Sequence, residues 1–107
     1  MSYWISLVSD DREHREIWHG VHCSWNYSDM MTHLPCDWAR DWQGKQAQDM
    51  LKPILKSINL LDSYPEDYEQ YEVDPEKGLG TIHWCIYILR ECFDAFRQYP
   101  KGIIVID

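Results

Sequence analysis

The chain has 107 residues and a net charge of −8, and 45% of its residues are hydrophobic. This hydrophobic share excludes a disordered chain, and the length suits one folded unit, so we expect a single domain over residues 1–107. The acidic charge disfavours contact with phosphate backbones, so we expect no nucleic-acid partner.

The start of the chain, Met1–Asp10, lacks the basic residues and the apolar run of a signal peptide. No stretch approaches the roughly 20 apolar residues of a membrane helix. We therefore expect a cytoplasmic protein without membrane contact. Its cysteines should then be reduced thiols, and they are Cys23, Cys36, Cys85 and Cys92.

Two strands are expected near the N-terminus. In Tyr3–Val8, aromatic and branched side chains alternate between two faces, which is typical of a strand. A second strand is expected over Arg15–His19, and it can continue past Gly20 through Val21–Trp25. In that continuous strand, His19 would share a face with the apolar side chains.

Short helical segments should follow. Ser28 can cap a short helix over Asp29–His33. Cys36–Trp42 can form a further helical turn that carries Trp38 and Trp42 on one side.

Two long helices are predicted. The first covers about Gln46–Leu61, and Pro53 inside it implies either a kink or a helix that begins near Lys52. The second, Thr81–Gln98, is the clearest amphipathic helix of the chain, with Thr81 as its cap. Its core face is expected to hold Ile82, Cys85, Ile86, Leu89, Cys92, Phe93 and Phe96, widened by Tyr87 and Ile88.

The last predicted element is a strand over Ile103–Ile106, apolar enough to be central in a sheet and expected to pair with Tyr3–Val8. The order of elements predicts an α+β fold. In this fold the N-terminal strands and the C-terminal strand form a small antiparallel or mixed sheet, which two long helices cover on one face.

The segment Asp62–Lys77 is rich in carboxylates and tyrosines. It is either a solvated connector with a helical turn around Glu66–Tyr71, or a surface in which tyrosines on one side bind a partner and carboxylates steer it. The candidate partner-binding residues are Tyr64, Glu66, Asp67, Tyr68, Glu69, Tyr71, Glu72 and Asp74.

A metal site is the main alternative. Two pairs of potential ligands with two-residue spacers could hold zinc in tetrahedral geometry: His19, His22, His33 and Cys36. The spacing is looser than that of paired zinc motifs, and on a continuous strand His19 and His22 point to opposite faces.

Three motifs carry a resemblance: Trp25-Asn26-Tyr27-Ser28, then Gly44-x-x-Ala47-x-x-x-Leu51-x-Pro53-x-Leu55, then Asp74-Pro75-x-x-Gly78-x-Gly80-Thr81. In this order, from Trp25 to Phe96, they resemble a group of uncharacterised small acidic phage, prophage and bacterial proteins. The group has no assigned activity, so the resemblance implies a phage accessory setting and no site residues.

The sequence therefore favours a small acidic non-enzymatic binding protein, a phage-related accessory or inhibitor that acts on a protein partner with a basic surface and needs no cofactor. The first alternative is a zinc-binding structural module that uses the histidines and cysteine of residues 19–36. The second is a hydrolase whose site the sequence does not reveal, since no cysteine has both a nearby histidine and a group to orient it.

Overall fold

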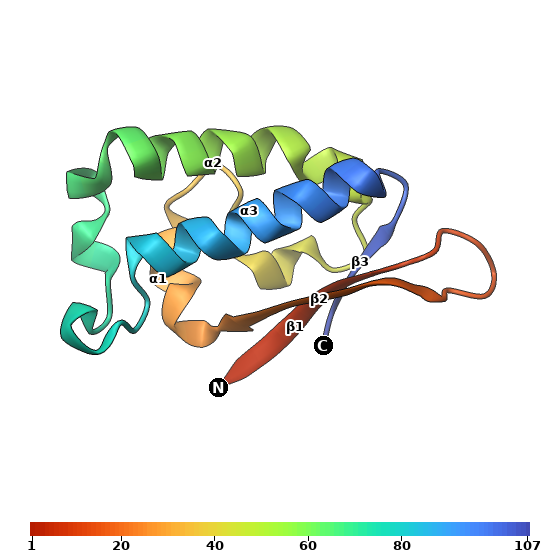
Figure 1. Cartoon of the computed structure of the whole chain (residues 1–107), viewed down its shortest axis with the longest axis horizontal. Helices are drawn as coiled ribbons and strands as arrows, with labels where there is room; N and C mark the ends of the chain where they lie inside the picture. The colour runs from red at the N-terminus through yellow and green to blue at the C-terminus, as the bar shows by residue number, and fades with distance from the viewer.

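A computed structural model describes residues 1–107. It confirms the predicted α+β fold: a three-stranded antiparallel sheet in the order β2-β1-β3, with α2 and α3 on one side of it (Figure 1). The strands are β1 (Ser2–Val8), β2 (Glu16–Ser24) and β3 (Ile103–Ile106), and the helices are α1 (Ser28–Thr32), α2 (Leu51–Ser63) and α3 (Ile82–Gln98). No helix combines the length and the apolar character that crossing a bilayer requires.

Strand β1 is the centre of the sheet and confirms the predicted alternation. Tyr3, Ile5 and Leu7 are buried beneath the helices. On the opposite face Trp4 is 50% exposed, and its ring lies 4.8 Å from that of His22 on β2. The helices therefore leave one face of the sheet uncovered, as Figure 1 shows.

Strand β2 runs unbroken past Gly20, but two register shifts interrupt its pairing with β1. Gly20 has φ +101°, and a Cβ there would lie 2.0 Å from the carbonyl oxygen of Ile5, so only glycine fits this close approach. The irregularity leaves His19 exposed, so the expectation that it shares the core face is wrong. Trp25 also lies outside the strand, in a 3₁₀ turn.

Strand β3 pairs with β1 as predicted but lies at the edge of the sheet, not at its centre. The chain at residues 43–47 covers its outer side. Gly44 N–H donates to the Ile104 carbonyl (2.8 Å), Ile104 N–H donates to the Lys45 carbonyl (2.9 Å), and the Gln43 side chain accepts from Ile106 N–H (2.7 Å). Because residues 43–47 cover its outer edge, β3 can be as apolar as a central strand.

The short helical segments differ from expectation in detail. Ser28 is the first residue of α1 and not its cap, because the preceding 3₁₀ turn leads directly into the helix. The expected turn at Cys36–Trp42 is a 3₁₀ turn over Ala39–Trp42. Trp42 is buried and donates to the Cys36 carbonyl at 2.7 Å, whereas Trp38 packs edge-on against Tyr3.

The start of helix α2 shows which of the two alternatives for Pro53, a kink or a late helix start, is correct. The helix proper begins at Leu51, after a 3₁₀ turn over Ala47–Met50. Pro53 therefore lies in the first turn, where its missing N–H costs no hydrogen bond, which confirms the second of the two sequence readings.

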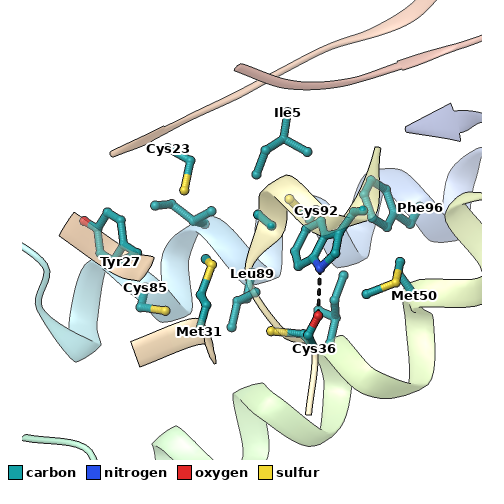
Figure 2. Close-up of a cluster of buried hydrophobic side chains, with 14 of the residues drawn as sticks. Ile5, Cys23, Tyr27, Met31, Cys36, Met50, Cys85, Leu89, Cys92 and Phe96 are labelled. Carbon is teal, nitrogen blue, oxygen red and sulfur yellow. Dashed lines mark hydrogen bonds between the residues drawn. The ribbon is translucent and has the colours of Figure 1, made fainter. Parts of the chain in front are cut away.

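Helix α3 packs between α2 and the sheet. Thr81 caps it as predicted, accepting from Trp84 N–H at 3.3 Å. Its buried side chains are Cys85, Ile88, Leu89, Cys92, Ala95 and Phe96. Figure 2 shows Leu89, Cys92 and Phe96 in the core cluster. The buried face is thus rotated from the expected one, so that Phe93 is only half-buried and Tyr87 is exposed.

Candidate binding surface

The acidic segment, defined as Asp62–Lys77, begins in the last two residues of α2 and makes up most of the connection between α2 and α3. It contains three 3₁₀ turns, over Pro65–Asp67, Glu69–Tyr71 and Pro75–Lys77. The single helical turn expected around Glu66–Tyr71 is therefore divided into two. Each turn is too short to present side chains at a regular helical spacing.

The three tyrosines of this segment do not share one side. Tyr64 is 53% exposed and lies in a shallow groove beside Pro35 at the end of α2. Tyr68 and Tyr71 pack against the hydrophobic core instead. Tyr71 also stacks on His33, with ring centres 4.2 Å apart and planes inclined by 12°. Only Tyr64 is therefore available as an exposed aromatic contact.

Three carboxylates of the segment have bonds within the chain. Asp62 forms an ion pair with Arg90 at 3.1 Å. Glu72 accepts from the backbone N–H of Ile82 at 2.9 Å, and Asp74 accepts from that of Lys77 at 3.3 Å. The other four carboxylates are exposed and form no ion pair: Glu66, Asp67, Glu69 and Glu76.

The proposed zinc ligands are divided between strand β2, the end of α1 and the loop that follows it. His19 and His22 are exposed on β2, and His19 contacts Glu16 at 2.9 Å. His33 follows α1, where its Nδ1 donates to the Asp29 carbonyl at 2.7 Å. Cys36 is buried. The structure contains no group of three or more histidine, cysteine or acidic side chains placed to hold a metal, so these residues do not form one ligand set.

All four cysteines are buried as free thiols. Burial raises the pKa of Cys23 to about 11 and that of Cys36 to about 12. Burial likewise raises the pKa values of Cys85 and Cys92 well above the ordinary value. Because the thiolate is the reactive form, these side chains behave as small hydrophobic residues at neutral pH.

Sequence reasoning missed an exposed aromatic pair at the start of α3. Trp84 is 46% exposed and Tyr87 is 47% exposed, with ring centres 5.7 Å apart. The signal was available in principle, because Trp84 lies outside the predicted core stripe. The sequence pattern places Tyr87 at the margin of that stripe, because apolar residues adjoin it on both sides.

Comparison with protein-family models, with curated proteins and with solved structures found no match to this chain. The surface is therefore interpreted from its own geometry and charge.

Proposed function

We propose that this protein is a small acidic, non-enzymatic binding protein whose partner is a protein with a basic surface. One observation carries the proposal: four exposed carboxylates gather on one connection without an ion partner, at Glu66, Asp67, Glu69 and Glu76. The proposed function requires no cofactor.

The energetic argument concerns repulsion. Like charges held close together in the folded chain raise its free energy and add nothing to its packing. A basic partner relieves this repulsion, and the negative field of a chain with net charge −8 speeds its approach. Asp62, Glu72 and Asp74 serve the fold through their internal bonds, so they contribute the local field while the four free carboxylates meet the partner.

An accessory or inhibitory role in a phage setting belongs to the same proposal. It rests on the resemblance over Trp25–Phe96 and on the binding chemistry just described. The zinc module and the hydrolase gain no comparable support, since the four candidate ligands do not come together in one group and the thiols are buried.

The test is affinity capture from a native cell extract with three forms of the protein. The first is the natural chain, and the second carries Glu66→Gln, Asp67→Asn, Glu69→Gln and Glu76→Gln. The third is a matched control that removes four exposed negative charges elsewhere: Asp10→Asn, Asp41→Asn, Asp49→Asn and Asp94→Asn.

A basic protein retained by the natural chain and the control, but lost from the acidic-segment variant, supports the proposal. With that protein purified, its association rate should fall about tenfold or more at low salt when the four carboxylates become amides. Equal capture by all three forms contradicts the proposal. Equal loss from both variants contradicts it too, because net charge alone would then account for binding.

A further inference from the structure

We infer that the anchor of this binding surface is an apolar patch at the N-terminal end of α3, and that it takes an amphipathic basic segment of the partner protein. The patch, called the α3 patch, consists of Val73, Leu79, Trp84 and Tyr87. The inference rests on the proposed function, because it names the apolar part of the same interface.

The α3 patch combines two side chains of α3 with two from the loop that precedes it. Trp84 and Tyr87 are one helical turn apart on α3, and their rings meet edge to face. The indole nitrogen of Trp84 lies 3.9 Å from the position that a Cβ at Gly78 would take, beside Leu79.

Val73 lies in the acidic segment, on the arm of the loop opposite Gly80. Its side chain lies 3.1 Å from the corresponding position at Gly80. Asp74 and Leu79 exchange two backbone hydrogen bonds, of 2.9 and 3.0 Å, which hold the two arms of this loop together. All four patch residues are among the exposed large apolar side chains of the molecule.

The fold itself gains little from these side chains. The buried face of α3 is made by other residues, such as Leu89 and Phe96, so Trp84 and Tyr87 leave about half of their surface in water. A contiguous group of large apolar side chains on a surface is a feature of interaction sites, and Trp and Tyr are the residues that most often dominate binding energy.

The acidic residues around the α3 patch favour a partner segment that carries positive charges. Asp74 and Glu76 lie on the loop that carries Leu79, and Glu91 lies one turn beyond Tyr87. Next to Tyr87 is an open groove lined by Asp62, His83, Ile86, Tyr87, Arg90 and Glu91. On the wall of this groove Arg90 pairs with Asp62 at 3.1 Å, whereas Glu91 forms no ion pair within the chain.

A segment that presents an apolar side chain between lysines or arginines complements this arrangement. Its apolar residue would cover Trp84 and Tyr87, while its cations would meet Glu76 and Glu91. A purely cationic segment would reach the carboxylates of the acidic segment but would leave the apolar patch exposed.

Two labelled peptides, titrated by fluorescence anisotropy, separate the contribution of the apolar patch to binding from that of the carboxylates. The probe for the α3 patch is the leucine–lysine peptide LKKLLKLLKKLLKL, and nona-arginine is the probe for the carboxylates alone. The variants are Trp84→Ala and Tyr87→Ala. The matched control is Trp4→Ala, which removes an equally exposed tryptophan from the uncovered face of the sheet. Urea unfolding of each variant verifies that it is folded.

We expect Trp84→Ala and Tyr87→Ala each to weaken binding of the leucine–lysine peptide about tenfold, with nona-arginine binding and the Trp4→Ala control unchanged. If Trp84→Ala does not fold, Trp84→Lys replaces it, because lysine keeps a long side chain. Its positive charge repels the lysines of the leucine–lysine peptide, so this variant should bind that peptide more weakly still. If these variants bind the leucine–lysine peptide as tightly as the natural chain does, the inference about the α3 patch is wrong. If nona-arginine still binds in that case, the proposed function is not contradicted. If neither peptide binds the natural chain, both proposals fail together.

Discussion

The carboxylate of Glu72 accepts a 2.9 Å hydrogen bond from the backbone N–H of Ile82, the first residue of α3. This bond satisfies one of the donors that every helix leaves free at its N-terminus, and it places a negative charge at the positive end of the helix dipole. It also fixes the acidic segment to the helix that carries Trp84 and Tyr87.

We expect Glu72→Ala to lower the free energy of unfolding by about 1 kcal/mol, because both the hydrogen bond and the favourable charge are lost. Glu72→Gln keeps an oxygen acceptor and should lose less. Urea denaturation measures both changes. Glu69→Ala is the control, since that exposed carboxylate has no bond within the chain; an equal loss in the control would exclude a role for the Ile82 bond.

The rotated face of α3 changes which phenylalanine matters for stability. Phe96 is fully buried, whereas Phe93 is half-buried beside Arg97. Phe96→Ala should therefore cost about 3–5 kcal/mol in urea unfolding, and Phe93→Ala less than half as much. Similar losses at the two positions would mean that Phe93 and Phe96 are equally part of the core.

Two glycines with positive φ provide a test of the β2 irregularity. At Gly20 a Cβ would collide with the Ile5 carbonyl oxygen at 2.0 Å, whereas at Gly44, with φ +83°, nothing lies within 4 Å. Gly44→Ala should cost about 1–2 kcal/mol from backbone strain alone. Gly20→Ala should cost clearly more, because β1 and β2 must also move apart. Thermal unfolding of the two variants compares them, and a smaller loss for Gly20→Ala would contradict the close approach.

From the raised pKa values of the buried thiols we predict how the free energy of unfolding changes at alkaline pH. Well below pH 9, the ordinary pKa of these groups, the thiols are neutral in both states and pH has no effect through them. Above it the unfolded chain releases thiol protons, whereas Cys23 and Cys36 hold theirs until pH reaches about 11 and about 12. The folded state then binds more protons, so stability falls by up to about 1.4 kcal/mol per pH unit for each thiol.

Denaturation at a series of pH values, with reductant present, measures this fall. A variant with Cys23→Ala and Cys36→Ala should show a shallower slope in the same range. An identical slope in that variant would assign the alkaline loss to other groups, such as Tyr27, whose pKa burial raises to about 12.

Local chemistry made much of the fold predictable. The alternation in β1 and the cap at Thr81 each follow from a few neighbouring residues, and the structure confirms them. For Pro53 the sequence allows either a kink or a helix that begins near Lys52, and the structure has the helix beginning at Leu51. The place of β3 in the sheet was not predictable in this way. Its apolar sequence suits a central strand, but irregular chain at residues 43–47 supplies the cover that another strand would have given.

The candidate site was less predictable, because it depends on how elements are turned relative to one another. Spacing placed Tyr87 beside the core stripe of α3, yet packing against α2 and β2 turns that side chain outward. Regular spacing also suggested that Tyr64, Tyr68 and Tyr71 share a side. Separate 3₁₀ turns break that register and bring the latter two, partly buried, against the core.

The cover over β3 has a consequence for self-association. An unprotected strand edge is a template on which another chain can add a strand and start aggregation. With β3 occupied, β2 offers the one remaining edge, and its two register shifts on either side of Trp18 interrupt the straight row of backbone groups that strand addition needs. The molecule can therefore keep a face of its sheet uncovered without inviting fibril-like growth from its edges.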